Sequence, residues 1–204
     1  MIVTVTGGAR SGKSAFAEKW CMKQGESGLY IATAQAYDTE MRQRIAHHRL
    51  QREESGFEWS TLEEPLRVAE LLEGAARQRE LIPAKAQPGA EALAPVVLID
   101  CLTLWLSNVM LMPDDGDENA DGMAGDHAVQ REMDRLVAAV ANYTGKLVMV
   151  TNEVGSGIVP EYPLGRKYRD WAGILNRKMA EISDQVFLVT AGIAIELKSR
   201  EYKL

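Results

Sequence analysis

Residues 7–14 have the spacing of a phosphate-binding loop. Their sequence, GGARSGKS, matches the pattern G-x-x-x-x-G-K-[ST] at every fixed position. Gly7 and Gly12 permit backbone conformations and close approaches that a Cβ atom would block, so the turn can point several N–H groups at an anion. Lys13 can reach the β- and γ-phosphates of a nucleotide, and Ser14 can place its hydroxyl on Mg²⁺. The segment therefore predicts a site for a nucleoside triphosphate.

The residues on either side support this interpretation. Residues 2–6 predict a buried strand and residues 15–20 predict a helix, which is the context that the motif requires. A helix that begins near Lys13 adds unpaired N–H groups and the positive end of its dipole. Arg10 lies inside the loop, where either phosphate or solvent could meet it. The alternative is a glycine-rich turn that contains a lysine by chance.

Two of the three histidines are adjacent, His47 and His48, within a helix expected over residues 38–54. Neighbouring residues on an α-helix point about 100° apart, so only one of the two easily serves a given site. His47 follows the polar face of this helix, whereas His48 follows the apolar face. Because an imidazole can attack phosphorus and form a covalent intermediate, His47 is the better candidate nucleophile. The alternative is an exposed pair of helical histidines without a chemical role.

Two further candidates follow apolar runs. Asp100 ends the run at residues 96–99, as the Mg²⁺-linked acid of phosphate-loop enzymes does, although an aspartate there could instead cap the next helix. Residues 151–160 follow another apolar run and contain two glycines beside Asn152 and Glu153. This second segment could form a ligand-binding loop, or it could only connect a strand to the next helix.

Strand and helix patterns alternate along the chain. The expected strands are residues 2–6, 28–33, 57–61, 96–100, 146–151, 185–190 and 193–197. The expected helices, after the first, are residues 38–54, 65–72, 102–109, 126–143 and 163–182. This alternation predicts an α/β fold with a mostly parallel sheet, helices on both faces and a C-terminal antiparallel hairpin around Gly192. Ligands then bind at the carboxyl ends of the strands, after Thr6, Thr33, Asp100 and Thr151.

The composition sets broader limits. The 204 residues suit one domain over residues 1–204, and the net charge of −6 argues against a general nucleic-acid binder. Six acids gather within residues 114–126, which predicts a solvated loop, with a metal site as the alternative. The two cysteines fit no metal-ligand spacing, no apolar run spans a bilayer, and the chain starts with its first strand rather than a signal segment. We therefore expect a cytoplasmic protein.

Several segments together resemble one known family, the bifunctional adenosylcobinamide kinase/adenosylcobinamide-phosphate guanylyltransferases of cobalamin biosynthesis. The resemblance covers nearly the whole chain. Its marks are TGGARSGKS at 6–14, YIATAQ at 30–35, Asp38, Glu40, Met41, RIAHH at 44–48, WSTLE at 59–63, DCLT at 100–103 and TNEVGSGIVP at 151–160. Residues 83–95 and 113–126 depart from the family's compact pattern, which puts oligomer contacts and corrinoid-binding loops in doubt.

The resemblance implies two reactions. A kinase reaction moves the γ-phosphoryl group of ATP or GTP to the aminopropanol hydroxyl of adenosylcobinamide. A guanylyltransferase reaction forms a covalent guanylyl-histidine from GTP, releases pyrophosphate and passes GMP to adenosylcobinamide phosphate, which gives adenosylcobinamide-GDP. The matching nucleophile is His47, and Lys13 is the second catalytic residue. The resemblance also implies a RecA-like phosphate-loop fold and a homotrimer.

The same resemblance implies the nucleotide-binding positions. They are Gly7, Gly8, Ala9, Arg10, Ser11, Gly12, Lys13, Ser14, Thr33, Ala34, Gln35, His48, Arg49, Leu50, Gln51, Glu63 and Asp100. Mg²⁺ would be held by Ser14 and Asp100, and the partners would be small molecules, with no nucleic acid and no membrane span.

The sequence leaves two other functions open. One is another phosphate-loop small-molecule kinase that uses no histidine intermediate. The other is a nucleotide switch, which would carry an N-K-x-D guanine-reading motif. Residues 176–179 read Asn-Arg-Lys-Met and do not match that motif.

Overall fold

The computed structural model describes residues 1–35, 39–77, 94–112 and 125–203. For residues 40, 41, 44, 47 and 75–77 this description is confined to the backbone. The segment at 83–95, which departs from the family's pattern, and the acidic segment at 114–126 therefore lie largely outside the described residues.

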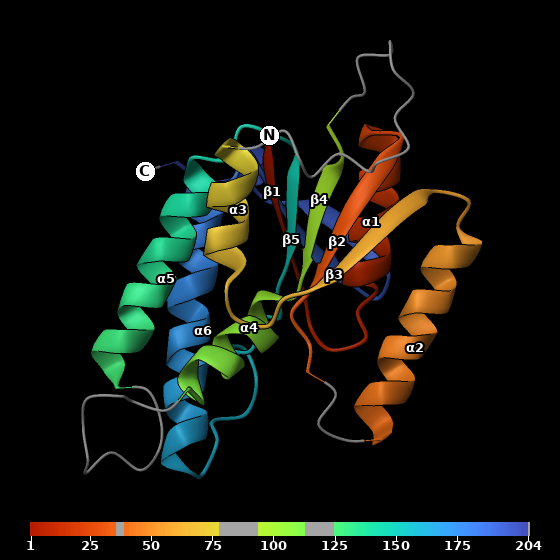
Figure 1. Ribbon diagram of the computed structural model, residues 1–204. Helices are drawn as coiled ribbons and strands as arrows, with labels where there is room; N and C mark the ends of the chain where they lie inside the picture. Colours follow the sequence, from red (N-terminus) through yellow and green to blue (C-terminus); the bar gives the residue numbers. More distant parts are fainter. Residues whose placement is uncertain (36–38, 78–93, 113–124, 204) are drawn as a thin grey trace.

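Seven strands form one sheet in the order β3-β2-β4-β5-β1-β6-β7 (Figure 1). The strands are β1 (Ile2–Thr6), β2 (Ser27–Ala32), β3 (Glu58–Glu63), β4 (Val96–Asp100), β5 (Leu147–Val150), β6 (Gln185–Thr190) and β7 (Ile193–Glu196). All neighbouring strands pair in parallel except β6 and β7, which form an antiparallel hairpin. The expected mostly parallel sheet with a C-terminal hairpin is confirmed.

The helices are α1 (Lys13–Gln24), α2 (Thr39–Glu54), α3 (Val68–Arg77), α4 (Leu102–Met110), α5 (Asp126–Ala141) and α6 (Pro163–Ile182), with a short 3-10 turn at Lys198–Arg200. One face of the sheet is covered by α3, α4, α5 and α6, the other by α1, while α2 stands beyond β3 (Figure 1). No helix within the described ranges is both long enough and apolar enough to cross a membrane.

One helix begins later than expected. The sequence predicts a helix from Pro65, but α3 starts at Val68. The Glu64 carboxylate accepts hydrogen bonds from the backbone N–H groups of Leu66 (3.1 Å) and Arg67 (2.8 Å), which holds these residues in a turn ahead of the helix.

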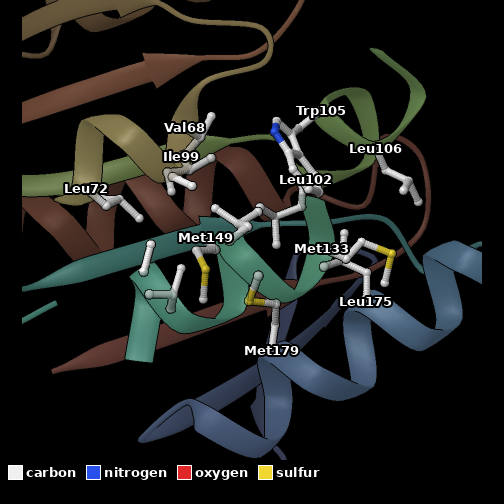
Figure 2. Packing of buried hydrophobic residues seen from close by; sticks show 14 of the residues in the cluster. Val68, Leu72, Ile99, Leu102, Trp105, Leu106, Met133, Met149, Leu175 and Met179 are labelled. Carbon is white, nitrogen blue, oxygen red and sulfur yellow. The ribbon is translucent and has the colours of Figure 1, made fainter. Parts of the chain in front are cut away.

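The central strands supply both cores of the molecule. Val97 and Ile99 of β4 pack into the core under α3 to α6, whereas Val96 and Leu98 pack under α1. Side chains alternate between the two faces of a strand, so a strand covered on both sides needs an uninterrupted apolar run. Figure 2 shows the larger core, where side chains of α3, α4, α5 and α6 meet over β4 and β5.

A single carboxylate ties the end of β7 to β6. Glu196 accepts hydrogen bonds from the backbone N–H groups of Val186 (3.1 Å), Lys198 (3.1 Å) and Ser199 (2.6 Å). The bond from Val186, followed by those from Ser199, lowers the pKa of Glu196 from 4.5 to about 2. Hydrogen bonds to the charged form produce such a shift because they favour the carboxylate over the neutral acid.

Replacing Glu196 by alanine should lower the thermal unfolding midpoint at pH 7. The folded-state pKa lies below the unfolded one, so the stabilisation is complete above pH 4.5 and disappears as the pH falls toward 2. The difference between Glu196→Ala and wild type should therefore shrink over that window. Glu201→Ala, at an exposed carboxylate nearby, is the matched control and should behave like wild type. A deficit that stays constant down to pH 2.5 would contradict this account.

Candidate functional site

The phosphate loop, residues 7–14, connects β1 to α1. Gly12 precedes the helix with a φ of 94°, in the left-handed region that favours glycine. Lys13 is only 6% exposed, and its ammonium donates a hydrogen bond to the carbonyl oxygen of Gly8 at 3.1 Å. The lysine charge is therefore held against the loop itself, beside the N-terminus of α1. Arg10 is exposed and has a φ of 57°.

Two distant segments brace this loop. The backbone N–H of Glu153, after β5, donates to the carbonyl of Gly7 at 3.1 Å, and the N–H of Gly192, in the β6–β7 turn, donates to the carbonyl of Ser11 at 2.9 Å. The C-terminal hairpin thus completes the support of the phosphate loop. Residues 151–160, for which the sequence left two interpretations open, contact the loop through Glu153.

Gly7 lies where the phosphate loop meets β6. A Cβ atom at Gly7 would lie 2.3 Å from the Val189 carbonyl oxygen, whereas a Cβ atom at Gly8 would meet nothing within 4 Å. We therefore expect Gly7→Ala to destabilise the protein by roughly 1–3 kcal/mol, because the backbone must shift. Gly8→Ala should stay within about 0.5 kcal/mol of wild type. Urea unfolding of both variants tests this expectation, and equal midpoints would contradict it.

The ends of β2 and β4 are joined by Thr33. Its hydroxyl donates to the Cys101 carbonyl at 2.7 Å and accepts from the Cys101 N–H at 2.9 Å, and the residue is fully buried. Thr33 therefore positions the strand ends through its side chain. Asp100 accepts a hydrogen bond from the Tyr30 hydroxyl at 2.9 Å. The N-cap residue of α4 is Cys101, so the alternative of Asp100 as a helix cap is not realised.

A polar network fixes the chain after β5. The Thr103 hydroxyl accepts from the Asn152 N–H at 2.8 Å, and the Asn176 amide donates to the Asn152 carbonyl at 3.0 Å. The Asn152 side-chain oxygen is buried and has no hydrogen-bond partner among the described residues. Because a buried acceptor without a donor is costly, this oxygen marks a position that a ligand or water would complete.

These elements surround a cavity of about 140 Å³ that opens to solvent. The strand order places the ends of β2, β4, β5 and β1 side by side, so the turns after these strands share one edge of the sheet. Six predicted nucleotide-binding positions line the cavity: Ser14, Ala34, His48, Arg49, Glu63 and Asp100. Asn152 lines it as well.

The remaining predicted positions are not among the described residues that line this cavity. Leu50 and Gln51 are exposed on α2, and Gln35 is half-buried beyond β2. His47 lies on α2 immediately before His48, and its side chain is outside the described part of the structure. The assignment of His47 as nucleophile stays a prediction.

Sequence reasoning missed a group of largely buried side chains at the cavity wall: Tyr30 and Arg52 line the cavity, and Glu18 lies beside Arg52. Arg52 lies 3.8 Å from the Glu18 carboxylate, and its guanidinium carbon lies 3.6 Å from the centre of the Tyr30 ring. Burial raises the pKa of Glu18 to about 7, with Arg52 opposing the shift and Asp100 adding to it. Helical spacing could have indicated two of these residues, because Glu18 follows Ser14 by four positions and Arg52 follows His48 by four.

Known proteins match this chain over nearly its whole length. A family model described as cobinamide kinase / cobinamide phosphate guanyltransferase matches residues 3–197. The bifunctional adenosylcobalamin biosynthesis protein CobU of Escherichia coli K12 is 39% identical over 201 residues, which cover 97% of this chain and all of that protein. CobP of Pseudomonas aeruginosa is 39% identical over 194 residues and 95% of each chain. CobU of Salmonella typhimurium is 38% identical over 200 residues, 97% of this chain and all of that protein.

Similarity to solved structures is weaker. A structure of a DnaB-like replicative helicase aligns with 92% of this chain and 46% of its own length, at a TM-score of 0.44 and 9% identity. An alignment at that level carries no information about function. A family model matches residues 3–197, and three relatives match over nearly their full lengths. The chain therefore belongs to the cobinamide kinase / cobinamide phosphate guanyltransferase family.

Proposed function

We propose that this chain is a bifunctional enzyme of cobalamin biosynthesis. It phosphorylates adenosylcobinamide with ATP or GTP and then transfers GMP from GTP to the product, which gives adenosylcobinamide-GDP. Family membership supports both activities. The observation that carries the proposal is the cavity where Ser14 of the phosphate loop, Asp100 of β4 and His48 of α2 meet.

The kinase reaction uses the phosphate loop. Phosphoryl transfer depends mainly on positioning and on neutralising charge. Lys13, held by the Gly8 carbonyl, and the N-terminus of α1 place positive charge where β- and γ-phosphates would lie. The acceptor hydroxyl of adenosylcobinamide attacks the γ-phosphorus and gives up its proton to solvent. The bond from the γ-phosphorus to the bridging oxygen breaks, and the nucleoside diphosphate leaves with those electrons.

Mg²⁺ fits the residues at this position. Ser14 and Asp100 line the same cavity, and hydroxyl and carboxylate oxygens are ligands that Mg²⁺ prefers. Within the described residues no cluster of three or more His, Cys, Asp or Glu side chains offers a metal cage. That suits Mg²⁺, which binds one or two protein groups together with phosphates and water. The ion would neutralise phosphate charge there.

The guanylyltransferase reaction needs a nucleophile, and we assign this role to His47. A ring nitrogen of His47 attacks the α-phosphorus of GTP, an N–P bond forms, and pyrophosphate leaves with the electrons of the broken P–O bond. The phosphate oxygen of adenosylcobinamide phosphate then attacks the same phosphorus and releases the imidazole. The phosphate loop can hold the departing pyrophosphate with the groups that hold β- and γ-phosphates in the kinase reaction.

Labelled GTP tests the proposal. Protein incubated with α-labelled GTP should retain an acid-labile label, protein incubated with γ-labelled GTP should not, and adenosylcobinamide phosphate should remove the label as adenosylcobinamide-GDP. A protein that phosphorylates adenosylcobinamide and never retains the α-label would be the rival, an ordinary phosphate-loop kinase. Tight GTP binding without turnover of either cobinamide would instead indicate a nucleotide switch.

We further propose that the chain is one domain, as its length indicates, that it acts in the cytoplasm, as its composition indicates, and that it forms a homotrimer, as the family resemblance implies. Light scattering should then give three times the mass of the 22.5 kDa chain.

A further inference from the structure

The helix that carries both histidines has little apolar attachment to the rest of the molecule. No residue of α2 belongs to either hydrophobic core cluster of the described residues. Among the α2 side chains that the structure describes, Arg52 alone is buried, with 5% of it exposed. The side chain that reaches deepest into the molecule is thus a charged one, near the C-terminal end of the helix.

Arg52 meets two other elements at once. Its Nη1 atom lies 3.8 Å from the Oε1 atom of Glu18, on α1 four residues after Ser14. Its guanidinium stacks 3.6 Å from the centre of the Tyr30 ring, on β2. The Tyr30 hydroxyl in turn donates to Asp100 at 2.9 Å. Arg52 therefore connects α2 to the helix of the phosphate loop and, through Tyr30, to the acid at the end of β4.

The contacts of Arg52 depend on charge. The Nε and Nη1 atoms of Arg52 and the Oε1 atom of Glu18 are buried and have no hydrogen-bond partner within the described residues. What holds them together is the ion pair and the cation–π contact with Tyr30, both of which are strong only where water is excluded. If α2 moved away, Arg52 would lose both contacts and Glu18 would lose its cationic partner. The Arg52–Glu18 ion pair and the Tyr30 contact thus favour the position of α2 against α1 and β2.

We propose that Arg52 is a positioning residue for guanylylation: it fixes α2 against α1 and β2, and so holds the His47–His48 segment, about one turn earlier, beside the nucleotide cavity. The inference rests on the proposed function, and it concerns a residue outside the predicted nucleotide-binding positions. Kinase chemistry uses Lys13, Ser14 and Asp100, none of which lies on α2. Loss of Arg52 should therefore slow guanylylation much more than phosphorylation.

Three variants and a control test this inference. Arg52→Met removes the charge and keeps much of the volume, and Arg52→Lys keeps the charge and loses the planar stack on Tyr30. The double variant Glu18→Gln/Arg52→Met removes both buried charges, so neither is left without a partner and folding is preserved. Gln43→Ala, at an exposed position of the same helix, is the matched control. Thermal midpoints are recorded for each protein.

The rate constant for covalent labelling is measured in single turnovers at saturating α-labelled GTP, and the kinase rate is measured with γ-labelled ATP and adenosylcobinamide. In Arg52→Met and in the double variant we expect labelling to slow at least 30-fold, with the half-saturating GTP concentration and the kinase rate within threefold of wild type. Arg52→Lys should be intermediate, and Gln43→Ala should match wild type.

A purely structural role predicts a different pattern. If the double variant labels at the wild-type rate, if its kinase rate falls in parallel, or if only the half-saturating GTP concentration changes, Arg52 does not position α2 for guanylylation. If wild-type protein and Gln43→Ala form no covalent adduct, the proposed function itself fails, and this inference fails with it.

Discussion

His47→Ala should abolish covalent GMP labelling and slow adenosylcobinamide-GDP formation by at least about a thousandfold, because no other group would form the N–P bond. The kinase rate should stay within about threefold of wild type, since phosphoryl transfer passes directly from donor to acceptor. Rapid-quench assays with α-labelled GTP and γ-labelled ATP on the same preparation measure the two effects separately.

His48→Ala is the companion variant for this experiment. His48 lines the cavity beside Arg49, so its loss should weaken GTP use while the adduct still forms. Mass spectrometry of the trapped protein should place GMP on residue 47. If the adduct forms in His47→Ala and disappears in His48→Ala, the nucleophile is the neighbouring imidazole. If both variants label normally, no histidine of α2 takes part.

Lys13→Ala should slow both reactions by about 100- to 1000-fold, the usual cost of removing one fixed charge that stabilises a transition state. The Lys13 ammonium is buried against the Gly8 carbonyl, at the point where either the γ-phosphate or the departing pyrophosphate would carry negative charge. Steady-state rates of both reactions, with the thermal midpoint as a check on folding, measure the effect.

Lys19→Ala is the matched control, because it removes an exposed lysine from the same helix, α1. Its rates should equal those of wild type. If Lys13→Ala slows phosphorylation alone, GTP for guanylylation binds away from the phosphate loop. If neither rate changes, the loop binds no reacting nucleotide, and the proposed function loses its main support.

The sequence by itself determined most of the local elements and the glycine-rich turn in which we propose that phosphate binds. The apolar run at residues 96–99 is short and contains three β-branched residues, which favours a covered strand over a helix. The helical period over residues 163–182 gives a helix whose bounds, Pro163–Ile182, were predicted in full. The motif at residues 7–14 is local as well, because its glycines and Lys13 act within one turn of chain. Each of these features depends on residues a few positions apart, so it can be predicted from the local sequence.

The tertiary structure alone decided which distant residues meet. Thr33 binds Cys101 across 68 positions of sequence. Gly192 binds Ser11 although the two residues lie near opposite ends of the chain, because β6 pairs beside β1 in the sheet. Helical spacing puts Arg52 on the same side of α2 as His48, but nothing in the sequence indicates that its side chain is buried against Tyr30 and Glu18. Contacts of this kind arise from strand order and from the close packing of elements far apart in the chain. The periodicity of the sequence indicates only which near neighbours share a face, so it cannot predict these long-range contacts.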